Sequence, residues 1–191
     1  MYQTINGLSG FPPADSLMTL AADGLPVVLV LVLAGLFVIP WRRDRLARRC
    51  GAVTAALATA LALLLNQAIS RAVGRVRPYM AHPLHAHLLV ARSHDPSFPS
   101  DHATAGFAVG VAILFYDRAV GVFLLLLAGV LAFARVYVGM HYPGDVLGGA
   151  LIGSAVALVL RAPVVRGRLE GLARSSSEVW EHGLRTLGIE K

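Results

Sequence analysis

Three groups of polar residues interrupt the long apolar stretches of this chain. They are Arg77-Pro78, then Pro99-Ser100-Asp101-His102, and then Arg135 with His141 and Asp145. Brought together by folding, they would supply guanidinium groups for an oxyanion, two imidazoles and a carboxylate. Such a set of side chains is suited to moving a phosphoryl group without a metal ion.

In the third group, His141 and Asp145 are four positions apart, which is about one helical turn. A carboxylate on one imidazole nitrogen fixes the tautomer and leaves the other nitrogen free to attack. Pro143 and Gly144 lie between them, so we expect the helix to start near Asp145 and the contact to resemble a helix cap. Taken alone, the pair also fits an interfacial histidine beside an N-cap aspartate. Arg135, six residues before His141, is expected to hold two phosphoryl oxygens in a fork.

The second group predicts a helix start, because Pro99 and Ser100 precede an apolar run from Ala103 onward. Backbone N–H groups at such a start favour an anion, and Ser100 can donate a further hydrogen bond. His102 is placed to protonate a leaving oxygen. The simpler interpretation makes Ser100 an N-cap and His102 an interfacial histidine. Asp101 is unexpected beside an anion, so we expect it to point away and to pair with an arginine.

The first group follows a long apolar run. Arg75 and Arg77 alternate in sequence, so they share a face if the backbone is extended, and one or both can reach a phosphate. Pro78 ends any helix there. Arg71 lies on the same approach and is a further candidate.

Composition indicates a membrane protein of one domain. Of the 191 residues, 56% are hydrophobic and 15% are charged, whereas soluble domains are about 45–50% apolar and about 25% charged. We predict an all-α, polytopic transmembrane helical bundle of about five or six spans, each of about 20 residues. The five apolar runs are Leu25–Trp41, Gly51–Ile69, Ala103–Tyr116, Ala119–Val138 and Val146–Leu160. The runs after His102 and Asp145 reach spanning length only with the polar turns that precede them.

Charge predicts the orientation. The short loop at 42–49 and the segment after Leu160 are rich in arginine, so both are expected in the cytoplasm. Residues 1–24 are predicted to form an interfacial segment with a surface helix at Pro12–Asp23, residues 25–161 the transmembrane core, and 162–191 a basic cytoplasmic tail that lies on the inner leaflet or is partly disordered. The loops at 70–101 and 139–144 then lie outside, so the active site faces outward from the plasma membrane.

Other ligands are not indicated. The start of the chain lacks a signal-peptide pattern, so the first apolar run is expected to be an uncleaved anchor. The single cysteine, Cys50, excludes an internal disulfide. His82, His85 and His87 have a spacing that suggests metal binding but no accompanying carboxylates. We expect no metal, no cofactor and no nucleic acid, and the lipid bilayer as the surroundings of the chain.

The three groups, in this order, resemble the signature of the type-2 phosphatidic acid phosphatase superfamily. That signature has three parts: lysine, six residues and arginine-proline; proline-serine-glycine-histidine; and serine-arginine, five residues, histidine, three residues, aspartate. The resemblance covers about residues 66–150. Asp101 replaces the glycine, Ala134 the serine and Ser70 the lysine, and either Arg71 or Arg75 is expected to supply the missing charge. The variant with aspartate looks most like the bacitracin-resistance type of undecaprenyl-diphosphatase.

The resemblance implies a role for each matched residue. His141 is the nucleophile and forms a phosphohistidine, Asp145 orients it, and His102 protonates the leaving group and then activates water. Arg77, Arg135 and Ser100 bind the phosphoryl oxygens. The implied substrate is undecaprenyl diphosphate. The alternatives are a phosphatidic acid or phosphatidylglycerophosphate phosphatase and, in a different class, a non-catalytic membrane protein that binds anions or lipids.

Overall fold

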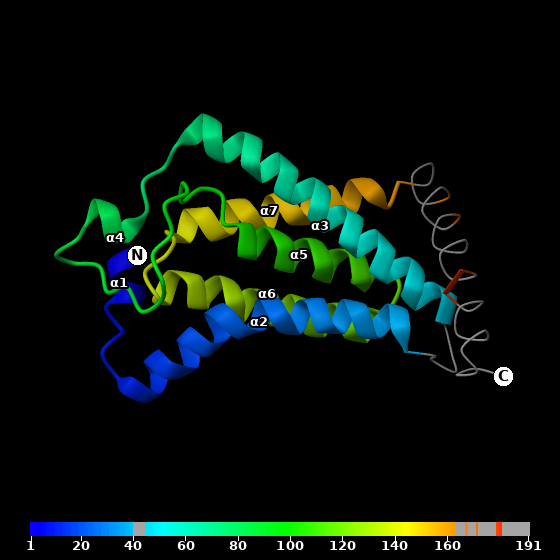
Figure 1. The fold of residues 1–191 in the computed structure, drawn as a ribbon, viewed down its shortest axis with the longest axis horizontal. Coiled ribbons are helices and arrows are strands. Elements are labelled where there is room, and N and C mark those ends of the chain that lie inside the picture. The colour runs from blue at the N-terminus through cyan, green and yellow to red at the C-terminus, as the bar shows by residue number, and fades with distance from the viewer. Residues whose placement is uncertain (40–44, 163–166, 168–170, 172–178, 181–191) are drawn as a thin grey trace.

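The computed structural model describes residues 1–39, 45–162, 167, 171 and 179–180, and the elements of that part of the chain are helices. In chain order they are α1 (Tyr2–Asn6), α2 (Pro12–Val38), α3 (Arg45–Val73), α4 (Pro78–Ala81), α5 (Asp101–Leu114), α6 (Arg118–Tyr137) and α7 (Pro143–Leu160). The long helices run lengthwise through one elongated bundle, and successive ones run in opposite directions (Figure 1). The predicted all-helical class is confirmed.

In the described part of the chain, four stretches are long and apolar enough to cross a membrane. They are α2, α6, α7 and the region Leu46–Ala81, which includes α3 from its second residue onward. The sequence predicted five or six. The difference is α5, which has 14 residues and is therefore about 21 Å long, against a hydrocarbon core of about 30 Å. It packs against α3, α6 and α7 inside the bundle. The surrounding helices extend beyond the start of α5 at the end of the bundle that carries α1 and α4 (Figure 1). The first residues of α5 therefore lie inside the bundle.

Small residues allow this close packing. Ala55, Ala58 and Ala62 form the buried face of α3. On α7, a Cβ added at Gly149 or Gly153 would collide with the backbone of α5. Close approach of helices through small residues is the usual mode of packing where lipid removes the hydrophobic drive for association. The α5–α7 contact thereby fixes the two helices that carry His102 and Asp145.

The N-terminal region differs from the sequence prediction. A separate surface helix at Pro12–Asp23 followed by a span from Leu25 was expected, but α2 is one helix of 27 residues with Pro26 inside it. Its buried residues, Ala22, Leu29 and Leu36, repeat every seven positions, so packing on one side continues past the proline. Helices in membranes tolerate proline when neighbouring helices support them. The interfacial placement of residues 1–24 stays a prediction.

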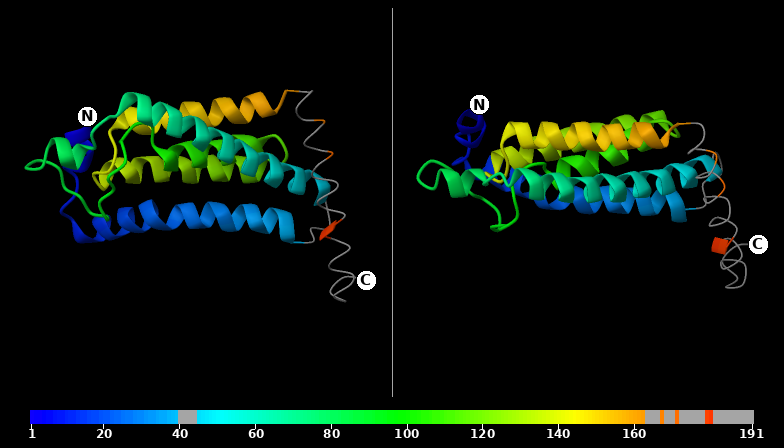
Figure 2. Two further views of the ribbon diagram at one scale, coloured as in Figure 1. Left: turned by 45° about the horizontal axis from the view of Figure 1, so that its top comes forward. Right: turned by 90° about the horizontal axis from the view of Figure 1, so that it is seen from above.

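The two ends of the bundle are different (Figure 2). At one end, α1, α4, the long loop between α4 and α5, and the short loop between α6 and α7 gather. There the Asn6 side chain donates to the carbonyl oxygens of His87 and Tyr137, both at 2.8 Å. At the other end, Asp117 caps α6 and pairs with Arg48 at 2.9 Å. Arg42, Arg43 and most of the predicted basic tail lie outside the described residues.

Candidate active site

A cavity of about 250 Å³ opens at the end of the bundle where the loops gather. Its lining includes five of the eight site residues predicted from sequence: Arg71, Arg77, His102, Arg135 and His141. They come from the end of α3, the segment before α4, the start of α5, the end of α6 and the α6–α7 loop. The other three, Arg75, Ser100 and Asp145, lie next to the cavity without lining it. The bundle thus brings the three sequence groups together.

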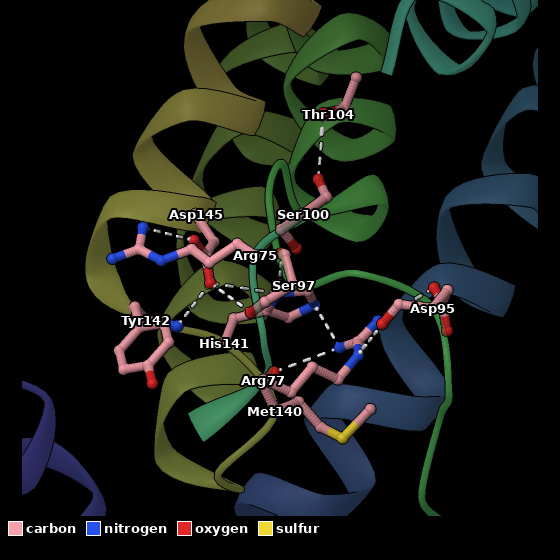
Figure 3. A network of polar contacts seen from close by, with 10 residues as sticks. All are labelled: Arg75, Arg77, Asp95, Ser97, Ser100, Thr104, Met140, His141, Tyr142 and Asp145. Carbon is pink, nitrogen blue, oxygen red and sulfur yellow. Dashed lines mark hydrogen bonds and ion pairs between the residues drawn. The ribbon is translucent and has the colours of Figure 1, made fainter. Parts of the chain in front are cut away.

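His141 is held in a defined orientation (Figure 3). Gly139 turns the chain after α6 with φ of 84°, a left-handed conformation that favours glycine. The His141 backbone N–H donates to the Arg135 carbonyl at 3.2 Å. In the ring, Nδ1 lies 2.8 Å from the Ser97 carbonyl oxygen. Because a carbonyl only accepts, Nδ1 carries the hydrogen and Nε2 keeps its lone pair.

The Nε2 atom of His141 faces Arg77, with Nη1 at 3.4 Å. Burial lowers the pKa of His141, and the charges of Arg77 and Arg135 lower it further, while Asp145 opposes the shift. The imidazole is therefore kept neutral, which is the state that a nucleophile requires.

Asp145 contacts His141 less closely than predicted. Its Oδ2 atom lies 3.8 Å from His141 Nδ1, beyond hydrogen-bond distance. The carboxylate instead accepts from Ser97 Oγ at 2.5 Å, the Tyr142 backbone N–H at 2.8 Å and Arg75 Nη1 at 3.0 Å. Asp145 caps the start of α7 by accepting from the Tyr142 N–H, but the predicted cap-like contact with His141 is too long for a hydrogen bond. Orientation of His141 by Asp145 stays a prediction.

Arg77 is buried, and each nitrogen of its guanidinium has at least one partner. Nε donates to the Asp95 carbonyl at 2.9 Å, Nη2 pairs with the Asp95 carboxylate at 3.0 Å, and Nη1 donates to the Met140 carbonyl at 3.2 Å. The Asp95 side chain is 60% exposed, so it is the partner that a phosphoryl oxygen can replace most easily. Arg135 is freer, since it reaches Asp23 only at 3.8 Å. Its buried Nε has no hydrogen-bond partner among the described residues.

The structure separates the two candidates for the missing lysine. Ser70, at the lysine position, and the adjacent Arg71 both line the cavity. Arg75 points elsewhere, to Asp145 and to the face of the Tyr142 ring. The prediction that Asp101 pairs with an arginine is wrong. In the part of the chain described, its carboxylate accepts a hydrogen bond from Asn66 Nδ2 at 2.9 Å instead.

The helix start predicted at Pro99 and Ser100 is confirmed, since α5 begins at Asp101 with Ser100 as the N-cap residue. The Ser100 hydroxyl does not cap the helix. It is buried and, among the described residues, has no hydrogen-bond partner. A binding role for Ser100 stays a prediction. His102, in the first turn of α5, lines the cavity.

A second hollow adjoins the cavity. It is an apolar groove of about 730 Å³ between α2, α3 and α5. Three residues, Gln67, Asp101 and His102, line both the groove and the charged cavity. Most of the groove lining is aliphatic, with Leu29 and Leu63 as examples. An apolar chain in the groove would therefore end at the polar cavity.

Some site residues were not assigned from the sequence. Ser97 and Met140 contribute backbone carbonyl oxygens, and Asp95 contributes both a carbonyl and a carboxylate. Carbonyl contacts carry no signal in residue type. For Ser97 the available signal was its position directly before Phe98-Pro99-Ser100. Described residues contain no group of three or more His, Cys, Asp or Glu that would hold a metal ion, and metal independence stays a prediction.

The bundle defines a class, that of multi-pass helical membrane proteins with a cavity lined by histidines and arginines at one end. The pattern of the PAP2 superfamily matches residues 51–166, and this chain belongs to that superfamily of lipid phosphatases, which are hydrolases. The family predicted from the three polar groups is confirmed.

Relatives and a solved structure support this assignment. The chain is similar to undecaprenyl-diphosphatase BcrC of Bacillus subtilis, with 30% identity over 83% of this chain and 80% of the relative. Decaprenylphosphoryl-5-phosphoribose phosphatase of Mycobacterium tuberculosis is 37% identical over 69% of this chain and 68% of its own length. The crystal structure of Aquifex aeolicus LpxE superposes with a TM-score of 0.64 at 26% identity, covering 83% of this chain and 90% of that one.

Proposed function

We propose that this phosphatase hydrolyses a lipid diphosphate, with undecaprenyl diphosphate as the substrate and undecaprenyl phosphate as the product. The observation that carries the proposal is the junction of the apolar groove with the charged cavity at Gln67, Asp101 and His102. A polyprenyl chain in the groove would leave its diphosphate among the arginines. The similarity to BcrC, named as an undecaprenyl-diphosphatase, supports the same substrate.

The proposed reaction starts at His141. Its Nε2 lone pair attacks the terminal phosphorus, so a nitrogen–phosphorus bond forms while the bridging phosphorus–oxygen bond breaks. Burial, with the charge of Arg135, lowers the pKa of His102 to about 4, so the proposed step requires that His102 takes up a proton when the anionic diphosphate binds. It then gives this proton to the leaving phosphate oxygen. Arg77, Arg135 and Arg71 hold the oxygens of the transferred group, whose charge is spread over them in the transition state. Fixed donors of this kind contribute about 10²–10³ in rate each.

The second step regenerates the enzyme. Neutral His102 accepts a proton from a water molecule, and the water oxygen bonds to phosphorus as the bond to His141 Nε2 breaks. Inorganic phosphate leaves, and His141 returns to its Nδ1–H form. The Nδ1–H hydrogen bond to the Ser97 carbonyl persists through both steps, because only Nε2 is phosphorylated.

A lipid phosphomonoester is the second candidate substrate. The Mycobacterium tuberculosis relative, whose name describes a decaprenylphosphoryl-linked sugar phosphate, is 37% identical to this chain. Such a substrate shares the polyprenyl tail and would use the same groove. Phosphatidic acid and phosphatidylglycerophosphate remain comparison substrates. A non-catalytic lipid-binding protein would bind these lipids and release no phosphate.

The test is phosphate release by the purified protein in detergent with a chelator present. We expect release from undecaprenyl diphosphate that exceeds release from phosphatidic acid and phosphatidylglycerophosphate. His141→Ala is expected to abolish it, whereas the matched variant His85→Ala, at an exposed loop histidine, keeps the wild-type rate. Activity that survives in His141→Ala, or that requires Mg²⁺, would contradict the mechanism. A preference for a monoester substrate would replace the first candidate by the second.

A further inference from the structure

Arg75, Ser97 and Asp145, none of which lines the cavity, form a closed ring of contacts next to His141 (Figure 3). Arg75 Nη1 donates to Asp145 Oδ1 at 3.0 Å, and Ser97 Oγ donates to Asp145 Oδ2 at 2.5 Å. The ring closes through the backbone, where the Ser97 N–H donates to the Arg75 carbonyl at 2.7 Å. The segment before α4, the loop before α5 and the start of α7 are thereby tied together.

The ring connects to His141 through Ser97. The Ser97 carbonyl accepts the Nδ1–H of His141 at 2.8 Å, whereas the nearest Asp145 oxygen is 3.8 Å from the same nitrogen. The position of the imidazole therefore depends on where Ser97 lies. Ser97 is held by Arg75 at its N–H and by Asp145 at its hydroxyl.

Arg75 supplies the charge in this arrangement. Asp145 is fully buried, and a buried carboxylate is costly unless it is paired and hydrogen-bonded. The Arg75 guanidinium pairs with it from outside, with 44% of its side chain exposed. Its Cζ atom lies 4.5 Å from the centroid of the Tyr142 ring, a cation–π contact that fixes its direction.

We propose that Arg75 is a positioning residue for the reaction: it neutralises and holds Asp145, and through Ser97 it sets the orientation and the Nδ1–H tautomer of His141. It does not touch the substrate phosphate, a task that falls to Arg71 among the two candidates for the missing lysine. The inference rests on the proposed function only for its kinetic consequence. The effect on the His141 tautomer holds whichever lipid is the substrate.

Arg75→Gln is the primary variant, with Arg92→Gln as the matched control, since Arg92 is exposed and outside the ring. A displacement of about 1 Å at a reacting group costs about 10²-fold, so we expect kcat to fall by about that factor in Arg75→Gln. KM for the lipid should change by less than about twofold, because no substrate contact is lost. Arg75→Lys restores the charge without the planar stack and should recover part of kcat.

A second readout is independent of turnover. With ¹⁵N-labelled histidine, NMR spectra of the protein in detergent at pH 8 should show His141, assigned by its loss in His141→Ala, as a single Nδ1–H tautomer. Arg75→Gln should give a mixture of tautomers, and Arg92→Gln should match the wild type. An unchanged tautomer in Arg75→Gln would overturn the proposal, as would a rise in KM with kcat unchanged. A wild-type protein that turns over no lipid phosphate would refute the proposed function, while the tautomer comparison would still decide the role of Arg75.

Discussion

At the scale of residues, the buried and neutral state of His141 has a consequence for pH dependence. His141 lies in the α6–α7 loop. Burial lowers its pKa below the usual value of about 6.5, and the charges of Arg77 and Arg135 lower it further. The acid limb of kcat/KM reports the base of the free enzyme. We therefore expect that limb below pH 6.5. A limb at or above pH 6.5 would contradict the assignment of His141 as the buried nucleophile.

The same pKa shift predicts a dependence of stability on pH. Because the folded pKa of His141 is lowered, the unfolded chain takes up the proton first as pH falls. This contribution to stability is fully present above about pH 6.5 and is lost as pH falls from there toward the folded pKa. Thermal midpoints of the wild type should fall over this window, and those of His141→Gln should fall less. Equal slopes for both proteins would show that other groups dominate.

The residue types of the site could be predicted from the sequence, whereas the contacts between these residues could not. The histidines and arginines were visible because their types and spacing are rare at apolar boundaries. The choice between Arg71 and Arg75 could not be made from the sequence. It depends on where α3 ends and on the direction in which the chain turns after Gly74. The role of Ser97 depends on its carbonyl oxygen, which every residue possesses. Backbone contacts of this kind appear only when the fold is known.

At the scale of elements, the packing of α5 on α7 sets the distance between the two sides of the site. A Cβ at Gly153 would collide with the Thr104 carbonyl, whereas one at Gly129 on α6 would meet open space. Gly153→Ala should therefore destabilise the protein by about 1–3 kcal/mol through overpacking. Gly129→Ala is the matched control and should be neutral or slightly stabilising, because alanine favours helix. Thermal unfolding in detergent distinguishes the two, and equal midpoints would contradict the close α5–α7 contact.

Element boundaries were predictable where polar residues mark them. The start of α5 follows Pro99-Ser100, as expected from helix-start signals. The last helix was expected to start near Asp145, but α7 begins two residues earlier at Pro143, because proline is favoured in the first turn of a helix. A helix start at Pro12 was predicted, but the continuity of α2 was missed, because Asp23 and Pro26 resemble a boundary in sequence. In the structure, the apolar face through Ala22, Leu29 and Leu36 continues across them. Local signals lose to tertiary packing when a helix has a continuous partner surface.

At the scale of the whole molecule, the two ends of the bundle differ in chemistry. The end with the cavity carries Arg71, Arg77 and Arg135 in contact with the site. The opposite end carries Arg48, paired with Asp117, and Arg161 stacked on Phe115. Arginines that bind a substrate are placed by that function and give no information on the orientation of the protein in the membrane. The positive-inside rule is therefore applied to Arg48 and Arg161. On this basis we predict that this end lies in the cytoplasm and that the site lies outside.

Orientation can be tested by labelling single cysteines in intact cells. The native Cys50 is buried, so it is first replaced by alanine. Leu84→Cys is placed in the loop at the site end, where Leu84 is 89% exposed, and Ala162→Cys at the exposed end of α7. A maleimide that does not cross membranes should label Leu84→Cys in intact cells and Ala162→Cys only after permeabilisation. The reverse pattern would put the cavity on the cytoplasmic face, where the enzyme would meet lipid phosphates of the inner leaflet instead.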